Sequence, residues 1–163
     1  MAKKVLVLCT GNSCRSIIAE ALINRTFDGK IAAYSSGVSA SGMVNPSAKK
    51  ILQSKGIWRD HYHSKPIKDL EQIEFDLVIT VCENASQTCP VFPGNTPVTH
   101  IGFDDPDGKE YEAFELCFEE FNSKLLTFIN DYSFAKYSIR FQKYSTTEQL
   151  RALSRTFILR LNN

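Results

Sequence analysis

The sequence predicts an α/β fold with three layers, in which helices flank a four-stranded parallel sheet. Apolar runs of strand length alternate along the chain with segments of helical periodicity. The clearest run is FDLVITVC, an apolar stretch bounded by Asp76 and Cys82. Strands that alternate with helices are typical of parallel sheets covered on both faces, because each helix carries the chain back to start the next strand.

The first elements follow in order. Residues 3–9 (KKVLVLC) predict a short buried strand, and residues 16–27 predict a helix with apolar residues on one face at Ile17, Ala21 and Leu22. The turn signal DGK at residues 28–30 separates that helix from a second strand over residues 31–37.

The remaining elements have equally local signals. Residues 45–56 predict a helix, with Asn45 placed to cap it, Pro46 in its first turn and Gly56 at its end. Residues 75–82 and 96–101 predict the third and fourth strands. A last helix over residues 111–129 carries apolar side chains at helical spacing: Phe114, Cys117, Phe118, Phe121, Leu125 and Phe128.

Length and composition predict one domain with a separate tail. The chain has 163 residues, 43% of them apolar and 23% charged, as in ordinary globular proteins. A net charge of +1 disfavours a general nucleic-acid binder. We find no secretory signal and no run near the ~18 apolar residues of a membrane span, so we expect a cytoplasmic protein. The domain is expected over residues 1–130.

The extension at residues 131–163 differs in charge, with six Lys and Arg residues against two acids. Its end predicts a basic amphipathic helix with a capping box formed by Ser145 and Glu148. Such a helix binds a membrane surface or an anionic partner, or it docks on its own domain or a second subunit. We favour docking.

The stretch CTGNSCRS, which opens at Cys9, predicts an oxyanion-binding loop. It joins a strand to a helix, and the backbone N–H groups of such a loop can converge on one anion with help from the positive helix end. The expected binding residues are Thr10, Gly11, Asn12, Ser13, Cys14 and Arg15. Gly11 is expected to let the backbone curl inward, and Asn12 tolerates a left-handed conformation.

Side chains of this loop predict nucleophilic catalysis. The Arg15 guanidinium presents a planar fork that matches two oxygens of a phosphate-like anion. The same donors stabilise a thiolate, so we expect Cys9 to be the nucleophile with a depressed pKa. Ser16 can donate its hydroxyl to that thiolate, whereas Cys14 is expected to pack or to be a redox bystander. The alternative is a Gly/Asn turn beside two buried cysteines.

Three motifs together carry a family resemblance: CTGNSCRS followed by AE, VITVCENASQTCP, and HIGFDDPDGKEY. With these, residues from about Lys4 to Ile129 resemble the low-molecular-weight tyrosine phosphatase superfamily, and within it the thioredoxin-coupled arsenate reductases. Cys9, Cys82 and Asp105 all follow strands, so one edge of the sheet is expected to gather them. The resemblance implies that Asp105, held extended by Pro106, is the general acid. Asp104 is expected to be a neighbour without that role.

Cys82 and Cys89 allow three interpretations. A zinc site with His100 has only three ligands and lacks a typical zinc spacing, so no metal site is predicted. Inert core cysteines suit Cys117 better than Cys89, which lies beside a proline in a polar segment. The third interpretation is a redox pair on a flexible loop.

The reductase resemblance implies a relay. Cys9 bonds to arsenate, Cys82 attacks Cys9 to release arsenite, Cys89 attacks Cys82, and thioredoxin reduces the resulting disulfide. No bound organic cofactor is needed, and phosphate or sulfate are expected to compete with arsenate. The alternative is a phosphatase with a Cys9 phosphocysteine, which requires only Cys9, Arg15 and Asp105. A binding module without activity is disfavoured, because these residues exceed what binding needs.

Some relatives bind potassium beside the loop, through residues that match Asn12, Glu20, Ser35 and a later aspartate. That aspartate falls on Lys65 here. The resemblance therefore predicts that the Lys65 ammonium occupies the cation position, pairs with Glu20 and steadies Asn12. The alternative is a solvated lysine. His61 and His63 are expected to be loop residues near the site entrance, and Trp58 and Tyr62 to be packing residues.

Overall fold

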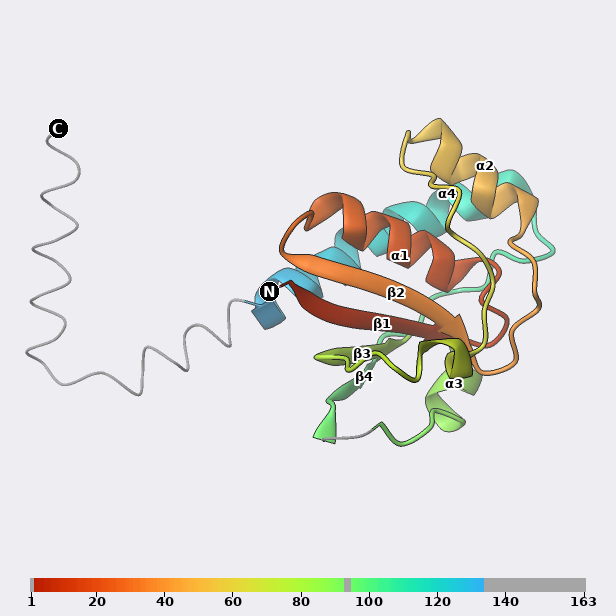
Figure 1. The fold of residues 1–163 in the computed structure, drawn as a ribbon. Helices are drawn as coiled ribbons and strands as arrows, with labels where there is room; N and C mark the ends of the chain where they lie inside the picture. Colours follow the sequence, from red (N-terminus) through yellow and green to blue (C-terminus); the bar gives the residue numbers. More distant parts are fainter. Residues whose placement is uncertain (1, 93–94, 134–163) are drawn as a thin grey trace, which may run out of the picture. The chain divides into compact units, whose positions relative to one another are not determined.

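The protein has the predicted α/β architecture in a computed structural model that describes residues 2–92 and 95–133 (Figure 1). One four-stranded sheet has the order β2-β1-β3-β4, and every neighbouring pair is parallel. Its strands are β1 (Lys3–Cys9), β2 (Ile31–Gly37), β3 (Leu77–Thr80) and β4 (Val98–His100). The four-stranded parallel sheet predicted from the sequence is thereby confirmed.

The strand register gathers the carboxyl ends of all four strands at one edge. Cys9 at the end of β1 pairs with Gly37 at the end of β2. Thr80 at the end of β3 lies between Leu8 of β1 and His100 of β4. In parallel sheets this edge is where ligands bind. The segments that follow Cys9, Thr80 and His100 therefore meet at the candidate site.

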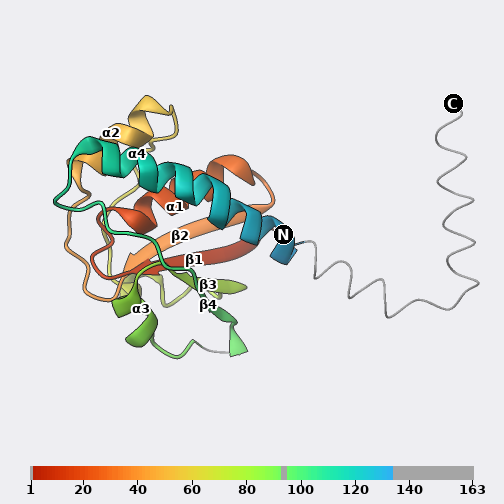
Figure 2. The same cartoon turned by 180° about the vertical axis from the view of Figure 1, so that it is seen from behind.

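Helices lie on both sides of this sheet, as Figures 1 and 2 show. Three helices pack against one another on one side, and one short helix lies near the strand ends on the other. The first three are α1 (Arg15–Thr26), α2 (Pro46–Ser54) and α4 (Tyr111–Glu120); the fourth is α3 (Glu83–Gln87). A 3-10 turn, η1 (Ile67–Leu70), follows α2, and a π-helical turn, η3 (Phe121–Leu125), continues α4.

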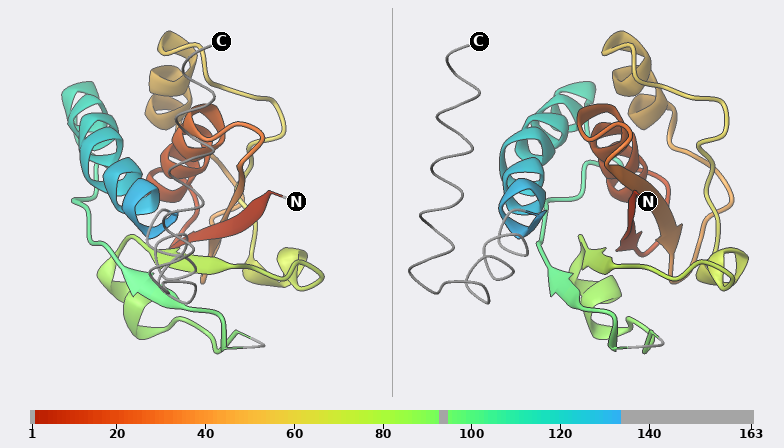
Figure 3. Two further views of the ribbon diagram at one scale, coloured as in Figure 1. Left: turned by 90° about the vertical axis from the view of Figure 1, so that its left-hand side faces the viewer. Right: turned by 60° about the vertical axis from the view of Figure 1, so that its left-hand side comes forward.

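The core surrounds α1. The apolar residues predicted on one face, Ile17, Ala21 and Leu22, are buried, but burial is not limited to that face, because every residue from Ser16 to Ile23 is buried. The helix lies between the sheet and the layer formed by α2, α4 and η3, so water reaches neither face (Figure 3). The largest fully buried side chains include Leu6, Leu8, Ile17, Ile18, Ile23, Phe114 and Phe121. A helix buried on all sides holds the loop at its start rigidly.

Two other predictions need correction at the same edge. Residues 83–87, expected to form a flexible loop between Cys82 and Cys89, form the helix α3. The third strand spans Leu77–Thr80 rather than residues 75–82. The chain therefore leaves the sheet before Cys82, whose backbone is extended at φ −140° and ψ 154°.

The predicted caps of α2 are confirmed. The Asn45 Oδ1 atom accepts hydrogen bonds from the backbone N–H groups of Ser47 and Ala48, at 2.8 and 3.4 Å. Pro46 is the first helical residue, and Gly56 ends the segment with φ at +68°.

The chain divides into two compact units, Met1–Leu126 and Thr127–Asn163. In the second unit residues 127–133 are helical. The predicted basic helix of the extension, with Ser145 and Glu148, lies outside the described residues. Within residues 2–92 and 95–133, no helix has the length and apolar character needed to cross a membrane.

Gly37 is expected to be essential to this edge, because a Cβ atom there would lie 2.6 Å from the Thr10 carbonyl oxygen and 3.0 Å from the Asn12 nitrogen. Backbone atoms cannot move aside without distorting the loop. We expect Gly37→Ala to lower the free energy of unfolding by about 1–3 kcal/mol, the usual cost of overpacking, as measured by urea denaturation.

Gly102→Ala is the matched control, because its Cβ would meet only the end of the His100 side chain at 3.2 Å. Equal stability of the two variants would contradict the prediction.

Candidate functional site

The loop between β1 and α1 owes its curvature to Asn12, which has a φ of +49°. Gly11 does not adopt a left-handed φ, and a Cβ atom there would meet only ordinary contacts at 3.5 Å and beyond. The prediction that Gly11 supplies the curl is therefore wrong, whereas the left-handed conformation at Asn12 is confirmed. Asn residues adopt this conformation more readily than most.

Cys9 receives two hydrogen bonds at its sulfur. The Asn12 backbone N–H donates at 3.1 Å, and the Ser16 hydroxyl lies 2.9 Å away. The Ser16 oxygen itself accepts a hydrogen bond from the Asn12 side-chain amide at 2.8 Å. The hydroxyl proton is thereby left free to point at Cys9, which places Ser16 as a donor to a thiolate.

The Cys9 pKa differs from the sequence prediction. Burial raises the pKa of the thiol above its ordinary value of 9.0, against the lowering effect of the hydrogen bonds from Ser16 and Asn12. The nearby Cys82 raises it further. The predicted depressed pKa is therefore wrong for this arrangement, because burial outweighs the hydrogen bonds that favour the thiolate.

Arg15 connects the start of α1 to the segment after β4. One guanidinium nitrogen donates to the Phe103 carbonyl oxygen at 3.1 Å, and another forms an ion pair with the Asp105 carboxylate. The Arg15 side chain is only 12% exposed, whereas the Asp105 side chain is 49% exposed. The fixed cation and the predicted general acid are therefore in direct contact.

Cys82 lies against the oxyanion loop. Its sulfur is 3.2 Å from the Thr10 hydroxyl oxygen, and that oxygen accepts a hydrogen bond from the Asn84 amide at 3.1 Å. Cys82 is buried at the start of α3, whereas Cys89 follows the end of the helix and is half-buried. The structure thus brings Cys9, Thr10 and Cys82 together and leaves Cys89 at the far end of α3.

The two remaining cysteines are held as thiols. Burial raises the pKa of Cys14 to about 12 and that of Cys117 to about 12. Neutral buried thiols pack as small apolar groups and react slowly. This agrees with the packing roles expected for both residues.

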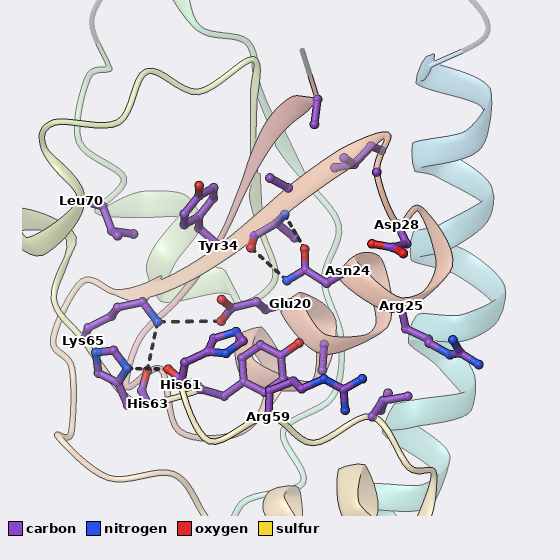
Figure 4. Close-up of a pocket in the computed structure, with 18 of the residues that line it drawn as sticks. Glu20, Asn24, Arg25, Asp28, Tyr34, Arg59, His61, His63, Lys65 and Leu70 are labelled. Atoms are coloured by element: carbon purple, nitrogen blue, oxygen red, sulfur yellow. Dashed lines mark hydrogen bonds and ion pairs between the residues drawn. The ribbon is translucent and has the colours of Figure 1, made fainter.

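The predicted cation position is a connected set of buried polar groups, of which Figure 4 shows the contacts among Glu20, Lys65 and His63. The Asn12 amide donates to Ser35 at 2.8 Å, and the Ser35 hydroxyl donates to Glu20 at 2.5 Å. The Lys65 Nζ atom lies 3.8 Å from the Glu20 carboxylate and donates to the His63 carbonyl oxygen at 3.1 Å. Lys65 contacts Asn12 through its backbone N–H, at 2.8 Å, rather than through its ammonium.

Burial raises the pKa of Glu20, and the Lys65 charge opposes that effect. Glu20, Lys65, His61 and His63 line a cavity of about 800 Å³. None of residues 9–15 is among the residues that line it, whereas both histidines line it together with Glu20 and Lys65. Tyr62 is buried and contacts Trp58 edge to face, as a packing residue does.

Within residues 2–92 and 95–133, no three His, Cys, Asp or Glu side chains come together as a metal site would require. His100 contacts Thr80 through Nδ1 at 2.9 Å and lies 3.7 Å from Glu83 through Nε2.

Two residues of the site were not predicted from the sequence. The Ser64 hydroxyl donates to the Gly11 carbonyl oxygen at 2.9 Å and fixes the loop from outside. Asn84 holds Thr10 from a distance of 74 residues along the chain. Ser64 belongs to no motif, and Asn84 lies within VITVCENASQTCP without a predicted role. Both contacts depend on how distant segments meet.

A cysteine at the end of a parallel strand, an arginine opening the next helix and a carboxylate against that arginine define an enzyme that attacks oxyanions through a covalent cysteine intermediate. The chain belongs to the low molecular weight phosphotyrosine protein phosphatase family, whose model matches residues 4–136.

Within this family the chain is similar to arsenate reductases. It is 39% identical to arsenate reductase 1 of Staphylococcus epidermidis over 126 residues, which is 77% of this chain and 95% of the relative. A solved arsenate reductase in a phosphate-binding state is 29% identical, with a TM-score of 0.65 over 79% of this chain and 98% of that one. The arsenate reductase of Archaeoglobus fulgidus is 28% identical, with a TM-score of 0.67 over 77% and 98%.

Ser16→Ala is expected to raise the pKa of Cys9 further, because it removes a donor that favours the thiolate. A hydrogen bond to a charged group is worth about 1.5–3 kcal/mol, so alkylation of Cys9 at pH 8 should slow about tenfold or more. The rate is followed by iodoacetamide labelling and peptide mass spectrometry, with Cys89 in the same protein as the internal control. Unchanged labelling of Cys9 would show that Ser16 does not donate to it.

Proposed function

We propose that this protein is an arsenate reductase, which converts arsenate to arsenite through Cys9, Cys82 and Cys89. The observation that carries the proposal is the position of Cys82, with its sulfur against Thr10 of the oxyanion loop and Cys89 at the other end of a five-residue helix. The similarity to arsenate reductases supports the same conclusion.

In the first step arsenate enters the loop and Arg15 turns from Asp105 to two of its oxygens. The loop N–H groups of residues 10–15 bind the remaining oxygens. The Cys9 thiolate forms a bond to arsenic, and the departing oxygen leaves as water after Asp105 gives it a proton. Phosphate and sulfate have the same tetrahedral shape, so both are expected to compete.

In the second step the Cys82 thiolate attacks the Cys9 sulfur. A Cys9–Cys82 disulfide forms, the bond between sulfur and arsenic breaks, and its electron pair remains on arsenic. Arsenic(V) is thereby reduced to arsenic(III), and arsenite leaves. The proximity of Cys82 to Thr10 and its effect on the Cys9 pKa support this step.

In the third step the Cys89 thiolate attacks the Cys82 sulfur, and Cys9 leaves as a thiolate. With α3 between them the two Cα atoms are roughly 10 Å apart at 1.5 Å per residue. A disulfide requires less than about 7 Å. The helix must therefore unwind for the Cys82–Cys89 disulfide to form.

We propose thioredoxin as the external reductant of this disulfide, because thiol–disulfide exchange needs an accessible sulfur and a dithiol donor. Cys89 is the more exposed of the two cysteines. The cysteines supply both electrons, so no bound cofactor is required. A cytoplasmic location fits five free thiols, since reducing compartments keep thiols in that form.

Phosphatase activity is the alternative, favoured by the family to which the chain belongs. It would pass through a Cys9 phosphocysteine and use only Cys9, Arg15 and Asp105. It would leave Cys82 and Cys89 without a part in the reaction.

Peptide mapping separates the two functions. Fully reduced protein is treated with excess arsenate without a reductant, and its disulfides are identified by mass spectrometry. We expect a Cys82–Cys89 disulfide that forms only with arsenate. Cys89→Ser is expected to stop the reaction at the Cys9–Cys82 disulfide, and Cys9→Ser to abolish both.

Phosphate in place of arsenate is the control for oxyanion binding without reduction. Five free thiols after arsenate treatment, together with hydrolysis of an aryl phosphate, would assign the protein as a phosphatase.

We further propose that the Lys65 ammonium takes the place of a potassium ion beside the loop. Its distance of 3.8 Å from the buried Glu20 carboxylate supports this assignment. Activity is expected to be equal in KCl and NaCl at matched ionic strength, because the positive charge is already covalently attached. A several-fold stimulation by potassium over sodium would contradict the assignment.

A further inference from the structure

Among the contacts that attach the segment carrying Asp105 to the rest of the site, two bear on its carboxylate. The first is Arg15, which contacts the Phe103 carbonyl oxygen and the Asp105 carboxylate. The second is Asn45, whose side-chain amide donates to the Asp107 carboxylate at 2.7 Å. The Asp107 backbone N–H in turn donates to Asp105 at 3.2 Å. A path of hydrogen bonds therefore leads from Asn45 to the general acid.

The Arg15 attachment is temporary in the proposed reaction. Its guanidinium must leave Asp105 in order to bind the oxyanion, and this happens just before Asp105 has to deliver a proton. The contact between Asn45 and Asp107 can persist when the anion binds, because neither side chain is expected to bind the anion. The Cys14 thiol also points at Asp107, at 3.8 Å, but an S–H group is a weak donor.

Asn45 is also fixed on its other sides. Its side-chain oxygen caps α2, and its backbone N–H donates to the Ser13 carbonyl oxygen at 3.0 Å. One residue thus contacts the oxyanion loop, the helix α2 and the acid segment at once. This geometry can keep the distance between the bound anion and Asp105 constant while Arg15 moves.

We propose that Asn45 is a positioning residue for the general acid, which acts through Asp107 to hold Asp105 at the departing oxygen. This inference rests on the proposed function in one respect, the assignment of Asp105 as the acid. The amide of Asn45 serves two purposes that a shorter cap would not: its oxygen caps the helix, and its nitrogen reaches the neighbouring carboxylate.

The test separates these two purposes. Asn45→Asp keeps an oxygen to cap α2 but turns a donor into a second carboxylate facing Asp107. The double variant Asn45→Asp with Asp107→Asn restores a hydrogen bond of reversed direction. Asp105→Asn is the reference for complete loss of the acid. The original protein and these three variants are compared for kcat/KM with phenyl phosphate and with 2,4-dinitrophenyl phosphate. Their kcat/KM for arsenate is measured with thioredoxin as the reductant.

A general acid matters for a poor leaving group and hardly matters for a good one. General acids contribute about 10²–10⁴-fold, so partial misplacement in Asn45→Asp should lower kcat/KM for phenyl phosphate about tenfold and leave the dinitrophenyl ester within about twofold. The double variant is expected to recover most of the loss. Arsenate turnover should fall and recover in the same order.

The outcomes are distinct. If Asp105→Asn shows no dependence on the leaving group, the assignment of Asp105 fails, and with it this part of the proposed function. If Asp105→Asn shows the dependence but Asn45→Asp lowers both esters equally, or neither, the inference about Asn45 is wrong.

Amide hydrogen exchange tests the role of Asn45 without turnover. It therefore remains decisive if the protein hydrolyses no aryl ester. With saturating phosphate, amides of residues 103–110 are expected to exchange faster in Asn45→Asp than in the original protein, and at the original rate in the double variant. Equal exchange in all three proteins would overturn the inference.

Discussion

The site depends on the hydrogen bonds of one side-chain amide, that of Asn12. Its oxygen accepts from the Lys65 backbone, which fixes the orientation of the amide, and its nitrogen then donates to Ser16 and Ser35. Each serine must pass its own proton onward, to Cys9 in one direction and to Glu20 in the other. Asn12 is fully buried, and a buried polar group left without a partner costs about 1–3 kcal/mol. The left-handed backbone at Asn12, the hydroxyl that donates to Cys9 and the cation position therefore all depend on the same amide.

Arg15 imposes the second constraint, because one guanidinium has two anionic partners. Arg15 pairs with Asp105, while burial raises the pKa of the Cys9 thiol. An oxyanion that draws Arg15 into the loop moves that charge toward Cys9 and removes it from Asp105. A positive charge near Cys9 favours the thiolate, which is the form a nucleophile needs. In the proposed reaction, binding of the anion is thus coupled to activation of Cys9.

The sequence predicted the parts of this structure that depend on local signals. The ends of the first two strands, the Asn45 cap and the cysteine-to-arginine loop were all visible in short motifs. It did not predict α3, because ENASQ is polar and shorter than the 11–18 residues over which periodicity can be recognised. It also placed the curl of the loop at Gly11 rather than at Asn12, and the positive charge of Arg15 near Cys9 rather than at Asp105. These follow from how distant segments meet: Lys65 orients Asn12, and Phe103 and Asp105 draw Arg15 away.

The helix α3 is the element in which stability and reaction oppose each other. Helices shorter than about 12 residues are marginal in isolation, so this five-residue helix depends on its contacts. Ala85 is the buried residue of this helix, and Asn84 donates to the Thr10 hydroxyl. Thr10 also contacts Cys82 and belongs to the loop that binds the anion. Cys82 leaves this contact when it bonds to Cys9, which weakens the attachment of α3 at its start. Unwinding then becomes easier at the step that requires Cys89 to approach. In the proposed relay, the Thr10 hydroxyl thus connects the anion loop to the helix that must unwind.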